Sequence, residues 1–155
     1  MEAASLYNHI SSKQLILNEL LMEIAELFTS RMTDIKNADQ TYLQKLEELV
    51  SLHVQMTVDF TDAISLIPNE WVHLKEPYIK DFLKLRDQYE KDFREIVVLA
   101  IKAKQLAKVN PDVALFSILS TLRWLYSWYT KNKGIDVEML KRELIQDLLY
   151  GLRSK

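Results

Sequence analysis

Apolar residues recur every three or four positions along most of this chain, the spacing that gathers side chains on one face of an α-helix. The first stripe consists of Leu17, Leu20, Leu21, Ile24 and Phe28. It predicts a helix over residues 12–36, and the hydroxyl of Ser11 or Ser12 is suited to cap its first turn.

A second stripe predicts a helix over residues 39–60, with Asn37 or Asp39 as its cap. Two prolines interrupt the next segment, residues 64–77. Proline lacks a backbone N–H and disfavours helix in the residue before it. This segment is therefore expected to be a short helix followed by a loop.

The next stripe predicts the longest helix of the chain, over residues 77–108. A compact helix start follows at residues 110–112, where Asn-Pro-Asp combines a capping side chain, a first-turn proline and an acid at the positive end of the helix dipole. The helix that it opens is apolar around most of its circumference as far as Tyr129, so it is expected to be buried on two sides.

Gly134 follows two lysines, a pattern typical of a helix closed by a left-handed glycine. Asp136 is then expected to cap a final helix that reaches Leu152. The apolar stripe of this helix is wider than one neighbouring helix would cover.

Composition supports an all-α fold in one unit. The 155 residues are 48% hydrophobic and include only two glycines and three prolines, which favours long helices with few turns. Cysteine is absent, which excludes disulfides and thiolate chemistry and suits a cytoplasmic protein. No signal peptide and no apolar run long enough for a membrane span is evident, so we expect no membrane association.

Charge and motifs narrow the function further. With 20 basic and 22 acidic residues, the net charge of −2 indicates no general affinity for nucleic acid. There is no glycine-rich phosphate loop and no His-x-x-x-His spacing. We therefore expect no enzyme activity, no bound metal and no cofactor.

Residues 5–13, Ser-Leu-Tyr-x-His-x-x-Ser-Lys, resemble the recognition helix of TetR/AcrR transcriptional regulators. The resemblance continues through residues 86–94, 110–112, 122–129 and 144–151. It implies a TetR-like helical bundle with a C-terminal two-helix dimerisation face.

The same resemblance implies two domains. Residues 1–36 would be the remnant of a helix-turn-helix DNA-binding domain, comprising its recognition helix and the connecting helix, and residues 37–155 would bind an effector and dimerise. The first two helices of the family's helix-turn-helix are expected to be missing from this sequence.

Roles in DNA binding follow from the resemblance. Tyr7 would contact the DNA backbone and Lys13 a phosphate. The full set of implied DNA-binding residues is Ala4, Ser5, Tyr7, Asn8, His9 and Lys13.

An effector cavity is expected to be lined by polar, aromatic and methionine side chains of the middle helices. The candidates are His53, Met56, Phe60, Trp71, Tyr89, Phe93 and Arg94. The resemblance implies a small apolar or acyl-CoA-like effector. Alternatively, His53 is a core histidine satisfied by a neighbour, and Arg94 pairs with an acid of its own or another helix.

The last two helices are expected to pack against their copies in a homodimer, because their apolar surface is two-sided. The residues implied at this interface are Leu122, Trp124, Leu125, Trp128, Leu144 and Leu148. A purely intramolecular bundle is the alternative.

Together these features predict a ligand-responsive DNA-binding regulator, expected to be a repressor, whose partners are a second copy, operator DNA and the effector. Two alternatives stay open. One is a dimeric ligand-binding module that does not bind DNA, and the other is a helical adaptor without a cavity.

Overall fold

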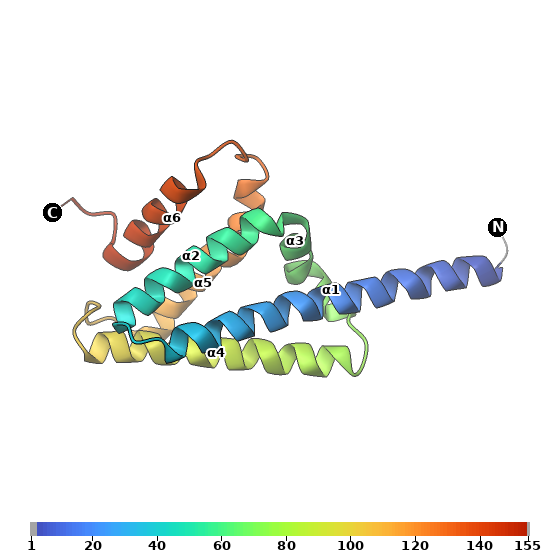
Figure 1. The fold of residues 1–155 in the computed structure, drawn as a ribbon, viewed down its shortest axis with the longest axis horizontal. Helices are drawn as coiled ribbons and strands as arrows, with labels where there is room; N and C mark the ends of the chain where they lie inside the picture. The colour runs from blue at the N-terminus through green and yellow to red at the C-terminus, as the bar shows by residue number, and fades with distance from the viewer. Residues whose placement is uncertain (1–2, 155) are drawn as a thin grey trace.

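The computed structural model describes residues 3–154, and these residues contain helices but no strand (Figure 1). The α-helices are α1 (Ala3–Asn37), α2 (Tyr42–Asp59), α3 (Thr61–Glu70), α4 (Tyr78–Lys102), α5 (Pro111–Tyr129) and α6 (Val137–Ile145). A 3₁₀ turn, η1 (Trp71–His73), follows α3, and a π-helical turn, η2 (Gln146–Tyr150), follows α6. The predicted all-α class is confirmed. No helix within residues 3–154 is long and apolar enough to cross a membrane.

Helix α1 is continuous, which corrects the prediction of a recognition helix followed by a second helix starting at Ser11 or Ser12. Both serines lie inside the 35-residue helix. No glycine or proline interrupts residues 1–37, so nothing in the local sequence forces a break. Figure 1 shows the N-terminal part of α1 extending away from the rest of the molecule.

The main core lies where α1, α2, α4 and α5 meet. Met32, Leu49, Phe93 and Leu122, one from each helix, are at most 1% exposed and belong to one cluster. The four stripes predicted from the sequence therefore face one another, which is how amphipathic helices bury their apolar sides.

Helices α1 and α4 run side by side in the same direction (Figure 1). Leu21 packs with Phe82 near the start of α4, and the Lys36 ammonium lies 3.0 Å from Asp92 and 3.3 Å from Glu95 towards its end. This pairing fixes the register of the two long helices.

Helix α2 begins at a capping box, and its cap residue differs from the predicted one. Thr41, not Asn37 or Asp39, is the cap: its hydroxyl accepts the Gln44 N–H, while the Gln44 side chain accepts the Thr41 N–H. The cap satisfies two backbone donors at the first turn.

Helix α4 ends at Lys102, earlier than predicted, and α1 is the longest helix of the described chain. Lys104 adopts a left-handed conformation with φ 60°. Its N–H donates to the Ile101 carbonyl, and the Gln105 N–H donates to Ala100, a Schellman closure in which glycine is usual. Because a lysine stands in the glycine position, no stop signal is visible in the sequence at this point.

The C-terminal helices confirm two predicted caps and correct one. Asn110 accepts two backbone N–H groups at the start of α5, and Asp136 accepts the Met139 N–H at the start of α6. Gly134 is not left-handed; the positive-φ glycine among the described residues is Gly151. The chain turns out of helix after η2, so Leu152 is 83% exposed and lies beyond the final helix.

Candidate functional site

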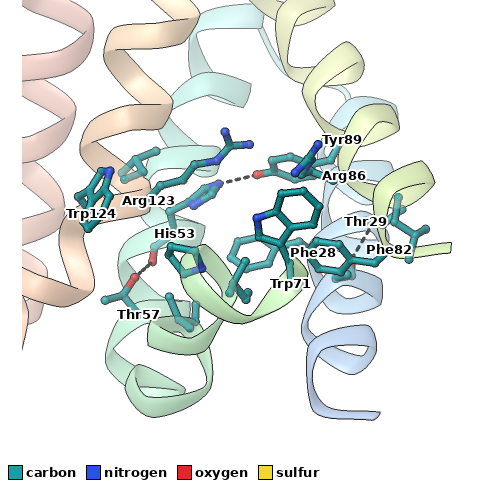
Figure 2. A pocket seen from close by; sticks show the side chains of 16 residues that line it. Phe28, Thr29, His53, Thr57, Trp71, Phe82, Arg86, Tyr89, Arg123 and Trp124 are labelled. Carbon is teal, nitrogen blue, oxygen red and sulfur yellow. Dashed lines mark hydrogen bonds between the residues drawn. The ribbon is translucent and has the colours of Figure 1, made fainter. Parts of the chain in front are cut away.

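A cavity of about 280 Å³ lies among α1, α2, α3, η1, α4 and α5 (Figure 2). Its wall is mostly apolar, and the larger apolar side chains in it are Phe28, Ile64, Ile67, Trp71, Phe82, Leu85 and Leu122. Arg86, Arg123 and Trp124 also line it and are partly or largely exposed, so the cavity opens between α4 and α5. A cavity of this kind counts against a fully packed adaptor.

Within the cavity, His53 of α2 and Tyr89 of α4 form a buried polar pair. The His53 Nε2 and the Tyr89 hydroxyl are 2.6 Å apart (Figure 2). Phe28 of α1 packs against both rings, with centroids 4.8 Å from His53 and 5.8 Å from Tyr89. Three helices therefore hold this pair in place.

Burial keeps both members of the pair neutral. It lowers the pKa of His53 to about 3, and the nearby Arg123 charge acts in the same direction. Burial also raises the pKa of Tyr89 well above its ordinary value, which Arg123 partly opposes. The buried phenol needs an acceptor for its proton, so the O–H donates to Nε2, and the neutral ring carries its own proton on Nδ1.

Two guanidinium groups reach the open side of the cavity. The Arg86 guanidinium lies over the Trp71 ring, 4.8 Å from its centroid. The Arg123 Nη2 lies 2.5 Å from a carboxylate oxygen of Glu90, which is not itself part of the lining. The site therefore joins an apolar interior to a cationic entrance.

Three of the seven predicted ligand residues line this cavity: His53, Trp71 and Tyr89. The other four lie elsewhere. Met56 and Phe93 are buried in core clusters, Phe60 is 42% exposed at the junction of α2 and α3, and Arg94 forms two hydrogen bonds with Asp112.

The other lining residues, among them Phe28, Arg123 and Trp124, were not predicted as ligand residues from the sequence. Arg123 carried a usable signal, because it is the only charged residue between Val113 and Thr130. A single charge in an apolar helix needs a partner or a ligand. Phe28 carried no comparable signal, because it continues an ordinary core stripe.

The residues predicted to bind DNA all lie on the exposed first turns of α1. Residues 3–13 are exposed throughout, and Tyr7 is 71% exposed. Their side chains are thus available to a partner, although the helix that bears them is the same helix that lines the cavity with Ala25, Phe28 and Thr29.

The predicted dimer residues divide into two groups. Leu122 and Leu125 are buried within the protomer, and Leu144 and Leu148 pack partly against its core. Trp124 and Trp128 are 58% and 46% exposed. Exposed Val113 and Phe116, which were not predicted as interface residues, extend this apolar face along α5.

The described part of the chain holds no cluster suited to a metal ion. No three His, Asp or Glu side chains within residues 3–154 come together as a metal site requires.

A sequence model of the tetracyclin repressor-like, C-terminal domain family matches residues 39–152. The chain belongs to this family. No curated protein is similar enough in sequence to count as a relative.

Solved structures of TetR regulators share this fold. The TetR family regulator PfmR from Thermus thermophilus is 19% identical with a TM-score of 0.81, and the match covers 99% of this chain and 84% of that one. KstR2 of Mycobacterium tuberculosis, a ketosteroid transcriptional regulator, is 18% identical with a TM-score of 0.82 over 100% and 80%. AibR, solved with isovaleryl coenzyme A and operator DNA, is 18% identical with a TM-score of 0.78 over 98% and 83%. The predicted TetR-like bundle is confirmed.

Proposed function

We propose that this chain is the effector-binding and dimerising part of a ligand-responsive transcriptional regulator of the TetR type, with no enzyme activity. The cavity carries the proposal, because its apolar wall and few polar groups are typical of a small-molecule site. AibR, which has a similar fold, was solved with isovaleryl coenzyme A. KstR2, also similar in fold, is a ketosteroid transcriptional regulator. Occupancy of the cavity would shift the population of protomer conformations and thereby the affinity for DNA.

The proposal includes a homodimer formed through α5 and α6. Val113, Phe116, Trp124 and Trp128 lie on one side of α5, interleaved with serine and threonine. Aromatic side chains with few charges are characteristic of the centre of a protein interface. A second copy would bury this face across a twofold axis.

A specific observation also supports a dimeric module that does not bind DNA. Residues 3–13 and the segment that follows them form one helix, whereas the resemblance implies a recognition helix followed by a separate connecting helix. Selection from a random pool of duplex DNA separates the two functions: enrichment of a common site supports the regulator, and no enrichment supports the module.

The cavity is tested with the neutral, environment-sensitive dye Nile red. We expect the dye to fluoresce on binding to the full chain and to lose this signal with Ala25→Phe, which fills the cavity from α1. The matched control is Ala4→Phe, an exposed position on the same helix. Binding that persists in a folded Ala25→Phe protein would contradict an effector site here.

The dimer is tested by sedimentation equilibrium. We expect twice the mass of one chain, and a monomer for the double variant Phe116→Glu, Trp128→Glu. Tyr7→Glu, which changes an aromatic residue of similar exposure on α1, should leave the dimer intact. A wild-type monomer would remove this part of the proposal.

A further inference from the structure

We propose that the cavity takes an amphipathic carboxylate, whose charged group binds Arg123 in place of Glu90 while its apolar chain occupies the interior. The inference rests on the proposed function, in which this cavity is the effector site, and it names the class of effector. The Arg123–Glu90 ion pair is then the resting state of the binding group.

The charged side chains of the cavity wall are all positive. Arg86 and Arg123 both line it, and no aspartate or glutamate among the described residues does. Arg86 has only a loose acidic partner, since its Nε lies 3.8 Å from Asp87, its neighbour in sequence. It is instead held over Trp71, which leaves guanidinium N–H groups for an incoming anion.

Glu90 forms an ion pair with Arg123 that a ligand carboxylate can replace. The side chains of Arg123 and Glu90 are 44% and 37% exposed, and ion pairs at such positions are weakened by water and salt. A ligand carboxylate presents the same acceptor geometry to the guanidinium, so it substitutes for Glu90 without leaving an unpaired charge. The exchange frees Glu90 to water rather than burying it.

His53 is a neutral polar group in the same cavity wall as Arg123. Its Nε2 is engaged by the Tyr89 hydroxyl, and Nδ1 has no hydrogen-bond partner among the described residues. Arg123 lies close enough to influence both rings electrostatically. In Figure 2 the Arg123 side chain extends from α5 towards the His53–Tyr89 hydrogen bond, so a head group at Arg123 lies at the boundary between charged and apolar walls.

The interior behind this boundary suits a hydrocarbon chain. Phe28, Ile64, Ile67, Phe82 and Leu85 offer no polar side-chain atoms. With a volume of 280 Å³, the cavity lies just below the usual range of about 300–1,000 Å³ for ligand pockets, which favours a single slender chain over a bulky ring system.

The test compares decanoate with 1-decanol by isothermal titration calorimetry on the full chain, with decanoate kept below its micelle concentration. The two probes share a chain and differ in the charge of the head group. We expect decanoate to bind at least ten-fold more tightly than decanol. Arg123→Gln should remove this preference by weakening decanoate binding far more than decanol binding.

Three further variants make the test specific. Glu90→Gln should tighten decanoate binding several-fold, because Arg123 loses its competing partner. Arg123→Lys should keep part of the preference, as a charge without the fork geometry. Arg94→Gln is the matched control: an arginine of α4 that pairs with Asp112 away from the cavity should have no effect.

Equal binding of the two probes, or a preference that survives in a folded Arg123→Gln protein, would overturn the inference while leaving the proposed effector cavity intact. Failure of both probes to bind the wild-type chain would overturn the inference, and if Nile red also failed to bind it would overturn the proposed function with it.

Discussion

His53 makes the stability of this protein depend on pH between about 5 and 7, where unperturbed carboxylate and ammonium groups keep their charge. The pKa of His53 is lowered from 6.5 to about 3 in the folded chain, chiefly by burial and also by Arg123. Between these values the unfolded chain binds a proton that the folded chain does not. The free energy of unfolding therefore falls as the pH decreases through this range.

The size of the effect follows from the shift. Each pH unit below the unfolded pKa costs about 1.4 kcal/mol, so lowering the pH from about 7 to about 5 removes about 2 kcal/mol of stability. Asp112, whose pKa is lowered by its hydrogen bonds with Arg94, loses its charge only below its usual value of 3.8. It therefore does not contribute in this window.

The measurement is urea unfolding followed by circular dichroism at both pH values. His53→Gln cannot be protonated but still offers an acceptor to the Tyr89 hydroxyl, so we expect it to lose most of the pH dependence. His73→Gln, at an exposed position in η1, controls for the substitution itself. If His53→Gln lost as much stability as the wild type between the two pH values, the assignment of the effect to His53 would be wrong.

Two further predictions concern packing and backbone conformation. Phe93→Ala, at a fully buried core position, should lower the free energy of unfolding by about 3–5 kcal/mol, whereas Tyr7→Ala on exposed α1 should change it by less than about 0.5 kcal/mol; equal effects in urea unfolding would refute the described core. Gly134→Ala should raise stability by about 0.4–1 kcal/mol, because its φ is not positive and no atom lies within 4 Å of an added methyl group. Gly151→Ala, at φ 88°, should instead lower the thermal midpoint, and a gain at Gly151 would contradict its left-handed conformation.

Helix boundaries were predictable where one residue decides them. Asn110 and Asp136 cap their helices as expected, because the side chain and the backbone that it satisfies are adjacent in sequence. The end of α4 was not predictable, since Lys104 takes a conformation that glycine usually occupies. Gln105, just beyond it, accepts the Leu43 N–H from the start of α2, a contact that no local pattern reveals.

Only some of the cavity residues were predictable, because the sequence does not show which part of each helix's buried side faces the cavity. His53 and Met56 were both assigned to the cavity from one helical stripe, but only His53 reaches it, while Met56 packs with Ile24 and Ile64. A stripe identifies the buried side of a helix and not which part of that side meets a void. The role of Arg123 depends on Glu90, 33 residues away, and so required the packing of α4 against α5.

Because α1 is long, a small tilt of this helix near the cavity would move its first turns by a large distance. Phe28 touches the cavity, whereas Ala3 begins the same unbroken helix about 25 residues earlier, or about 37 Å away at roughly 1.5 Å per residue. If α1 tilts about its cavity contact as a rigid rod, an angle of about 5° carries its far end about 3 Å, comparable to the span of a hydrogen bond. A displacement of this size at residues 3–13 is large enough to make or break contacts with a partner.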